Sequence, residues 1–340
     1  MRVEFVKQAE HWDNYVTSVA PQPSYHSWSW RTIIEETFGH EPYYLAAIED
    51  GRICGVLPLF LIRSRLFGNS LVSLPFFTYA GLLSSSEAAT SLLLNTAQGL
   101  ADQLGARSVE IRQGSAAPIP WIESSPRVTM ELVLPTSAEE YWKKLSSGMR
   151  NKIRQGQKAG FEIRWGGIQL ARAFYEVFAI NMRNLGTPVY PFRFFENQLR
   201  RMSDRITILT LWEGERVVAG SFLTAHGRTL ELPWSASLLE SRKKYSQVMM
   251  YWLFIQHAIS QGFERIDLGR CQRDSGTYNF KRHWNPVERP LYWYYRTKDG
   301  ASAPNLHADN PKFKIATKVW RHLPLTVTNS LGPRLVRVLP

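Results

Sequence analysis

The alternation of apolar and polar residues follows the same order twice along the chain. In the first half, apolar segments at 43–48 and 53–59 flank a polar turn that contains Gly51. In the second half, apolar segments at 206–212 and 217–223 flank a similar turn. Two apolar runs joined by a short turn with glycine are typical of a β-hairpin. The sequence therefore predicts one hairpin in each half.

Each hairpin precedes the same series of expected elements. A strand with aromatic and small residues comes first, then a helix with apolar residues at i, i+3 and i+4, then a short strand. The expected ranges are 76–81, 87–104 and 106–111 in the first half, and 232–237, 245–261 and 263–268 in the second. Gly105 and Gly262 suit the position that follows a helix end. The repeated order predicts two tandem α/β domains with mixed sheets.

The boundary between the two domains is expected at 134–137, where a proline and small polar residues follow an apolar strand. Either Thr136 or Ser137 is suited to cap the next helix. A basic tail follows, and its segment 311–321 alternates basic with apolar residues, as in a helix docked on the protein or one at a membrane surface. The predicted parts are residues 1–135, 136–298 and 299–340.

The chain has 41 Lys and Arg against 29 Asp and Glu, which gives a formal net charge of +12. This excess predicts an anionic partner: RNA, nucleotide phosphates, a phospholipid-linked sugar or a membrane surface. Residues 143–158 contain six basic residues and no acid. The alternative for this cluster is a solvated helix face.

No targeting or metal signal is found along the sequence. The amino terminus lacks the apolar segment of a secretion signal, and the uncharged stretch after Arg65 is interrupted by Pro75 and Gly81, so it is no spanning helix. Cys54 and Cys271 are far apart and lack the spacing of a zinc site or disulfide framework. We expect a cytoplasmic protein without a metal, with peripheral contact at the inner membrane through the basic tail as an open alternative.

The densest group of reactive side chains lies at 267–284, where an expected strand runs into a loop. Asp267-Leu268-Gly269-Arg270 is followed by Gly276-Thr277-Tyr278-Asn279-Phe280-Lys281, and the stretch from Arg150 to Gly160 reads Arg-x-x-Ile-Arg-x-x-x-Lys-x-Gly. These motifs resemble those of FemAB-related proteins associated with exosortase and exopolysaccharide systems. Such proteins are members of the N-acetyltransferase-like (GNAT) superfamily.

The resemblance implies two tandem GNAT-like acyltransferase domains. It implies transfer of an acyl or aminoacyl group to an amino or hydroxyl group of a lipid-linked or nucleotide-linked glycan, or of a peptidoglycan-type precursor. The implied co-substrate is acyl-CoA, acyl carrier protein or aminoacyl-tRNA, with no tightly bound cofactor. FemAB enzymes that use aminoacyl-tRNA often carry a coiled-coil arm, for which this sequence has no heptad run. The alternative function is a non-catalytic GNAT-like module that binds RNA or anionic polysaccharide.

Three residues are candidates for the chemistry. The resemblance places Lys281 at the acceptor phosphate and the reacting carbonyl, where it would stabilise an oxyanion or position a phosphate. Asp267 is either a general base or a cap at the strand end. Tyr278 either hydrogen-bonds a substrate or packs as an aromatic residue at a domain seam. His283 is an alternative base, and Cys271 lacks the partners of a catalytic thiolate.

Binding residues are expected around the amino end of the second domain's central helix, where backbone N–H groups and the helix dipole suit a phosphate. The predicted donor-binding residues are Trp234, Ser235, Arg242, Lys243, Lys244, Tyr245 and Ser246. The predicted acceptor or phosphate-binding residues are Arg150, Lys152, Arg154 and Arg270. Helical spacing predicts Arg150 and Arg154 on one face, with Lys152 turned away. We expect the domains to flank a cleft that contains Lys281 and Asp267.

Overall fold

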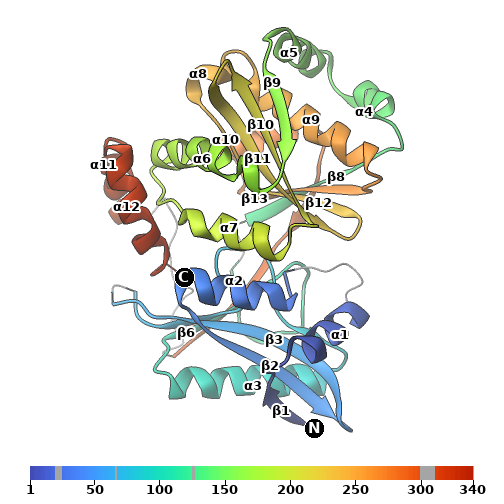
Figure 1. Cartoon of the computed structure of the whole chain (residues 1–340). Helices are drawn as coiled ribbons and strands as arrows, with labels where there is room; N and C mark the ends of the chain where they lie inside the picture. Colours follow the sequence, from blue (N-terminus) through green and yellow to red (C-terminus); the bar gives the residue numbers. More distant parts are fainter. Residues whose placement is uncertain (20–24, 66, 125–126, 299–310, 340) are drawn as a thin grey trace. The chain divides into compact units, whose positions relative to one another are not determined.

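The computed structural model describes residues 1–19, 25–65, 67–124, 127–298 and 311–339 (Figure 1). The chain divides into two compact units that are each discontinuous in sequence. The first unit comprises Met1–Val128, Pro290–Leu306 and Arg337–Pro340, and the second comprises Thr129–Arg289 and His307–Val336. Part of the predicted tail, 299–310, lies outside the described residues. No helix in the described ranges is long and apolar enough to cross a membrane.

The first unit contains a mixed sheet in the order β1-β2-β3-β4-β6-β15-β7, with β5 beside β3. Its strands are β1 (Arg2–Phe5), β2 (Glu41–Glu49), β3 (Arg52–Ile62), β4 (Ser70–Val72), β5 (Leu83–Ser84), β6 (Ser108–Gln113), β7 (Ile122–Glu123) and β15 (Tyr292–Thr297). Its helices are α1 (Ala9–Val19), α2 (Trp28–Phe38) and α3 (Glu87–Gln103). The predicted first hairpin is confirmed as β2–β3, and the predicted helix as α3.

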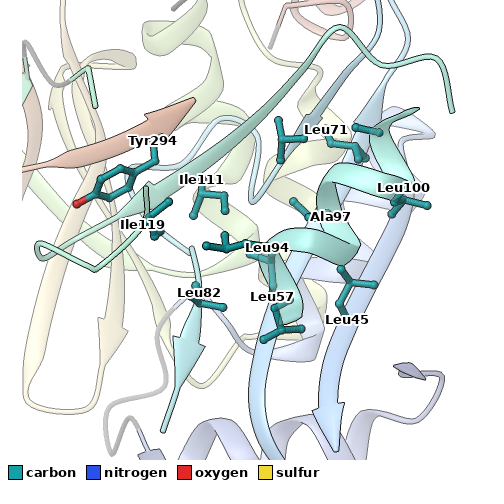
Figure 2. Close-up of a cluster of buried hydrophobic side chains, with 14 of the residues drawn as sticks. Leu45, Leu57, Leu71, Leu82, Leu94, Ala97, Leu100, Ile111, Ile119 and Tyr294 are labelled. Atoms are coloured by element: carbon teal, nitrogen blue, oxygen red, sulfur yellow. The ribbon is translucent and has the colours of Figure 1, made fainter. Parts of the chain in front are cut away.

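Alternate residues of β2 and β3 pack against different helices, because successive side chains of a strand point to opposite faces. Leu45 and Leu57 lie in a cluster with Leu94 and Leu100 of α3 (Figure 2). Tyr44, the neighbour of Leu45, instead contacts Trp12 of α1, with ring centroids 4.4 Å apart. The sheet is thus buried on both faces, and each fully buried side chain of this size stabilises the unit by about 1.5–3 kcal/mol.

The second unit contains another mixed sheet, in the order β14-β8-β13-β12-β11-β10-β9. Its strands are β8 (Arg127–Val133), β9 (Glu162–Gly166), β10 (Ile206–Glu213), β11 (Arg216–His226), β12 (Thr229–Ser237), β13 (Arg265–Gln272) and β14 (Val287–Pro290). Its helical segments are α4 (Ala138–Lys144), α5 (Ser147–Lys158), η1 (Ile168–Leu170), α6 (Ala171–Leu185), α7 (Phe192–Arg201), α8 (Leu239–Arg242), α9 (Ser246–Ser260), α10 (Gly276–Arg282), α11 (Pro311–Trp320) and α12 (Leu325–Val336). The second hairpin is confirmed as β10–β11.

Aromatic side chains fill the face of the second sheet that α6 and α7 cover. Phe222 of β11 and Trp234 of β12 lie with ring centroids 5.5 Å apart and contact Phe195 of α7. On the other face, Trp165 of β9 stacks on His257 of α9 at 4.4 Å. His257 is therefore a packing residue of the central helix. Ser137 caps α4 by accepting a hydrogen bond from the Glu140 N–H, as expected for the start of this unit.

The prediction of a strand at 76–81 is wrong. Parallel pairing of β4 with β6 ends at Val72, and the chain then leaves the sheet. Pro75 has no N–H to donate to a neighbouring strand. The Arg112 guanidinium holds the departing segment by donating to the carbonyls of Leu74 and Phe77 at 3.2 and 3.1 Å.

The boundaries of the two units also differ from the sequence-based ones. β8, which the sequence assigns to the end of the first domain, lies in the second sheet. β15, which the sequence assigns to the second domain, pairs antiparallel with β6 from Tyr292↔Gln113 to Thr297↔Ser108. Local hydrophobic patterns identify strands but carry no information on which sheet a distant strand joins. A single cut near residue 135 therefore does not describe this chain.

Candidate functional site

The candidate site begins where the parallel strands β12 and β13 of the second unit stop pairing. Their register runs from Thr229↔Arg265 to Glu231↔Asp267. Gly269, two residues later, has φ +74°, and a Cβ at this position would lie 3.1 Å from the Leu232 carbonyl oxygen. Glycine fits here because it tolerates positive φ and leaves room for the neighbouring backbone. The turn of β13 exposes the carbonyls of Gly269 and Arg270 to the elements that follow.

Asp267 is buried at the last position where β13 pairs with β12. Its carboxylate accepts hydrogen bonds from the Thr129 hydroxyl of β8 and from the Gly269 N–H at 2.8 Å. Burial, with the nearby Glu231 carboxylate as the next cause, raises the pKa of Asp267 to about 6. The bond to Gly269 is the predicted strand-end cap, while the raised pKa brings the carboxyl into the range of a general base near neutral pH.

Lys281 is also buried, at 4% exposure, so it is not a surface lysine. It lies in the last turn of α10, which Ser275 caps by accepting from the Tyr278 N–H. The Lys281 Nζ donates to the carbonyls of Gly269 at 2.7 Å and Arg270 at 3.3 Å. Burial lowers the pKa of Lys281. An ammonium has three N–H donors, so one remains beyond these two bonds.

Other predicted chemical residues take different places. The Tyr278 hydroxyl donates to Glu288 of β14, and this bond raises the pKa of Tyr278. The Cys271 thiol is buried, and burial raises its pKa, which opposes a thiolate role. His283 is exposed at the end of α10. His283 thus lies at the exposed edge of the site, while Tyr278, Asp267 and Lys281 are all buried.

A pocket of about 360 Å³ adjoins this region, between α5, the start of α9 and α10. Its lining combines basic, polar and apolar side chains: Met149, Lys152, Arg242, Tyr245, Gln247, Val248, Asn279, Phe280 and His283. Tyr245 precedes α9 with φ +61°, no side chain in the described ranges caps this helix, and its first turn carries no acid. Uncapped N–H groups at the positive end of a helix favour an anion. The pocket therefore suits a phosphate group.

The equivalent helix of the first unit lacks this property. The Ser86 side chain caps α3 by accepting a hydrogen bond from the Ala89 N–H, and Glu87 lies in the first turn. A capped N–H and a carboxylate both disfavour a bound anion at this end of the helix. The duplicated fold thus has an uncapped helix start at α9 in the second unit, whereas the start of α3 is capped.

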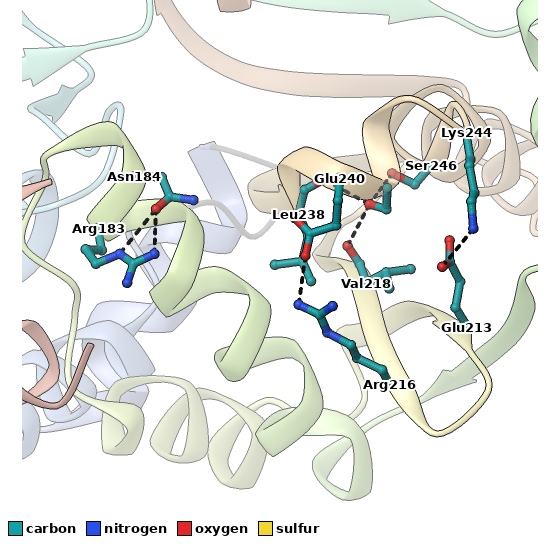
Figure 3. Close-up of polar contacts among 10 residues, drawn as sticks. Arg183, Asn184, Glu213, Arg216, Val218, Leu238, Glu240, Lys244 and Ser246 are labelled. Atoms are coloured by element: carbon teal, nitrogen blue, oxygen red, sulfur yellow. Dashed lines mark hydrogen bonds and ion pairs between the residues drawn. The ribbon is translucent and has the colours of Figure 1, made fainter. Parts of the chain in front are cut away.

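Polar contacts fix the turn that leads into α9 (Figure 3). The hydroxyls of Ser241 and Ser246 lie 2.8 Å apart, and Ser241 also bonds the Val218 carbonyl of β11. Lys244 donates to Glu213 at 3.1 Å, so this predicted donor-binding cation is engaged with the β10–β11 hairpin. These contacts hold the start of α9 in place before any ligand binds.

The remaining predicted donor-binding residues divide into two groups. Arg242 lines the pocket and is held by bonds to Ser237 and Asn181, each at 2.9 Å. Lys243 is exposed on the same turn. The Trp234 ring, by contrast, packs in the aromatic core, and the Ser235 hydroxyl lies 3.5 Å from that of Ser221 on the neighbouring strand. Neither the Trp234 nor the Ser235 side chain is in the pocket lining, so their roles stay predictions.

The predicted acceptor-binding cations are separated by the geometry of α5. Lys152 lines the pocket, whereas the Arg154 guanidinium lies 5.5 Å from the Trp142 ring centroid. Arg150 and Arg270 are both half-buried, on α5 and β13 respectively. These positions are consistent with the expectation that Lys152 lies on a different face of α5 from Arg150 and Arg154. Of these three residues, however, only Lys152 lines the pocket. Sequence spacing alone could not show which face of α5 packs on α9.

Several residues of the site were missed by reasoning from the sequence. Thr129 and Glu231 lie beside Asp267 only because β8, β12 and β13 share one sheet. Glu231 could have been found from the sequence, because a charged residue between two apolar residues of a strand, Leu230 and Leu232, is unusual. Gln247 and Asn279 reach the pocket from α9 and α10.

The order of elements in the second unit identifies the fold. In chain order, the hairpin β10–β11 is followed by strand β12, helix α9, strand β13 and the short helix α10. Strands β12 and β13 are parallel and pair over only three residues of each, up to Glu231 and Asp267. The fold is that of GNAT proteins. Residues 143–282 match the family model described as an acetyltransferase (GNAT) domain. No curated protein sequence matches the chain significantly.

Three solved structures are similar to this chain over most of its length. FemX is 14% identical, with a TM-score of 0.63, over 88% of this chain and 98% of its own. A tandem GNAT protein from the clavulanic acid biosynthesis pathway is 10% identical, with a TM-score of 0.59, over 89% and 100%. The C-terminal domain of a protein assigned as a lysylphosphatidylglycerol synthetase from Agrobacterium fabrum is 12% identical, with a TM-score of 0.58, over 86% and 94%. At these identities the similarity shows the tandem GNAT fold.

Proposed function

We propose that the second GNAT unit transfers an acyl group from a phosphate-bearing donor to an amino or hydroxyl group of a cell-envelope glycan precursor. The observation that carries this proposal is the uncapped start of α9, which adjoins a pocket with Lys152 and Arg242. Phe280 of the pocket lining precedes Lys281 in α10, and the Lys281 Nζ contacts the Gly269 carbonyl, two residues after Asp267.

Acyl-CoA is the donor we favour. The match of residues 143–282 to a GNAT acetyltransferase domain supports it. Acyl carrier protein presents a phosphate-linked thioester of the same kind and is the second donor to test. Aminoacyl-tRNA comes third, because the longest helix in the described part of the chain, α3, has 17 residues and forms no extended arm.

The acceptor class follows from the resemblance of the closing motif to FemAB-related proteins and from the structural neighbours. One neighbour is FemX, and another is assigned as a lysylphosphatidylglycerol synthetase, whose name denotes a lipid product. A lipid-linked or nucleotide-linked glycan with a free amine or hydroxyl, as in exopolysaccharide synthesis, fits the basic surface of the chain. The protein would then act on the cytoplasmic side, where these precursors are made.

The residues divide the chemistry of transfer between them. Asp267 accepts the proton of the attacking amine or hydroxyl, whose lone pair forms the new bond to the thioester carbon. The remaining N–H of Lys281 stabilises the carbonyl oxygen as it becomes negative. The C–S bond then breaks, the departing thiolate takes up a proton from solvent, and Asp267 releases to solvent the proton that it accepted.

Binding and turnover test these roles separately. Lys152→Ala removes a pocket cation, so we expect CoA to bind about 10-fold more weakly or worse by calorimetry, as for a lost charge-assisted contact. Lys158→Ala, on the same helix but outside the pocket lining, is the matched control and should bind as the parent does. Lys281→Met should lower kcat about 10²- to 10³-fold with any accepted donor. Unchanged CoA binding in Lys152→Ala, or unchanged turnover in Lys281→Met, would refute the assignment.

The alternative, a non-catalytic module for RNA or anionic polysaccharide, is supported by the six basic residues at 143–158, which are all exposed except the half-buried Arg150. It makes an opposite prediction. Affinity for a single-stranded RNA would fall steeply with salt, and no acyl donor would be consumed. Measuring RNA binding at two salt concentrations beside donor turnover therefore distinguishes the two functions.

A further inference from the structure

The carboxyl-terminal helices α11 and α12 belong to the second unit (Figure 1). α12 packs on α6, and Arg321, directly after α11, donates to the Leu185 carbonyl of α6. A Cβ at Gly186 would clash with the Thr317 side chain, and a Cβ at Gly332 would lie 2.8 Å from the Val189 nitrogen. Trp320 of α11 is buried at 9% exposure. Both helices therefore have a defined inner face, and glycine at two positions permits the close approach.

The outer faces carry apolar residues that stay exposed in the described part of the chain. On α11, Ile315 is 72% exposed and Val319 is 57% exposed. On α12, Val327, Leu331 and Leu335 are each between 36% and 40% exposed. Residues four apart lie on one side of a helix, so each set forms a row. Exposed rows of this kind mark an interaction surface rather than scattered surface residues.

The charge of these helices has one sign. From Pro311 to Pro340 the sequence has six Lys or Arg and no Asp or Glu. Lys318 is exposed on α11 and Arg334 is exposed on α12. Helical geometry places Lys318 about 60° from Ile315, and Arg334 about 60° from Leu331, at about 100° per residue. Each apolar row is thus flanked by a cation on its outer side.

We propose that these outer faces, formed by Ile315, Lys318, Val319, Leu331 and Arg334 with their neighbours, bind the surface of a bilayer that contains anionic lipid. An apolar row beside basic residues is the pattern of a helix that lies in the membrane interface, where the apolar side chains insert and the cations meet lipid phosphates. Binding to nucleic acid would use the cations but leave the apolar rows exposed to water. The bilayer is the partner that accounts for both features, independently of the proposed enzymatic function.

Sedimentation with vesicles tests this surface in the full chain. We expect binding to vesicles of phosphatidylglycerol and phosphatidylcholine, and little binding to phosphatidylcholine alone. Ile315→Asn with Val319→Asn should abolish most of the binding. Lys318→Ala and Arg334→Ala should each weaken binding to the anionic vesicles about fivefold. All four positions are exposed, so the substitutions should not disturb the fold. The thermal unfolding temperature of each variant, measured in parallel, checks this.

Two controls make the result specific to α11 and α12. Val133→Asn with Leu239→Asn replaces apolar residues of similar exposure, 59% and 57%, on other elements and should leave binding unchanged. Lys143→Ala with Lys158→Ala removes cations of the α4–α5 region and should have little effect. Absence of vesicle binding by the parent chain would overturn the proposal. So would binding that survives the Asn substitutions on α11, or that is lost instead in the α4–α5 variant.

Discussion

Replacing Asp267 by Asn should stabilise the protein at alkaline pH while removing its activity. The carboxylate is buried among Thr129, Gly269, Glu231 and Lys281, and its pKa is raised to about 6 from an ordinary value of 3.8. Burial is the main cause of the shift and the Glu231 carboxylate the next. The folded protein therefore holds a charge that its surroundings disfavour.

The size of the effect follows from the shift. A difference of about two pKa units corresponds to about 3 kcal/mol, at 1.36 kcal/mol for each unit. Well above pH 6 the carboxyl is ionised in both the folded and unfolded chain, so the whole penalty applies. As the pH falls from 6 towards 4, the folded chain binds a proton that the unfolded chain does not yet bind, and the parent regains stability. The amide that Asp267→Asn introduces carries no charge and has no such dependence.

Thermal unfolding of the full chain at pH 8 and pH 5 measures this difference. We expect Asp267→Asn to unfold several degrees above the parent at pH 8, after about 1 kcal/mol is allowed for the buried amide N–H group. At pH 5 the gap should shrink to about half or less, because the parent is then largely protonated when folded. Asp204→Asn, at an exposed carboxylate, is the control and should show no pH-dependent gap. A gap that is equal at both pH values would refute a raised pKa for Asp267, and retained turnover would refute its role as base.

Two further substitutions test buried contacts, one in each unit. Arg112→Ala should lower the free energy of unfolding by about 3–5 kcal/mol, because it leaves the buried Glu110 carboxylate without its partner at 2.7 Å. Urea unfolding measures this loss, which should be smaller in the double variant Arg112→Met with Glu110→Gln. Gly332→Ala places a methyl group against the Val189 backbone and should speed hydrogen exchange in residues 311–339, while Leu331→Ala, at an exposed position on the same helix, should leave exchange unchanged. Exchange that is equally slow in Gly332→Ala would show that α12 tolerates the methyl group where it is docked.

Periodicity was sufficient to predict the repeated elements of the fold. The two hairpins, α3 and α9 were found because their apolar faces are long and regular, and Gly105 and Gly262 both adopt positive φ where a helix end was expected. The segment at 76–81 was not predicted correctly, since its aromatic residues pack as a loop on β6 instead of entering the sheet. The sheet that β15 joins depends on contacts about 180 residues apart, which local patterns do not encode.

The site was predictable in its residue types more than in its geometry. The sequence singled out Asp267 and Lys281, and both are buried beside the turn at Gly269. It did not show that Lys281 would reach back to two backbone carbonyls, because that requires α10 to fold onto β13. It did not show that the Trp234 ring packs in the aromatic core, and the binding role of this residue stays a prediction. Residue type indicates what a side chain can do, while burial and register decide what it does.

The two sheets offer an internal comparison that explains why one unit carries the candidate site. Glu110 of β6 and Asp267 of β13 occupy the same place in the register, each at the last paired position of its parallel strand pair. Two residues later the first unit has Arg112, which neutralises Glu110 and holds the segment after β4, whereas the second unit has Gly269. The acid of the first unit is thus committed to a structural ion pair. In the second unit the glycine supplies no charge at this position, and the cation comes instead from Lys281, bound to carbonyls and with an N–H still to donate. A carboxylate tied to arginine has little use as a base, so Arg112 gives Glu110 a structural role, and Gly269 at the matching position of the second unit is consistent with the proposed role of Asp267 as a base.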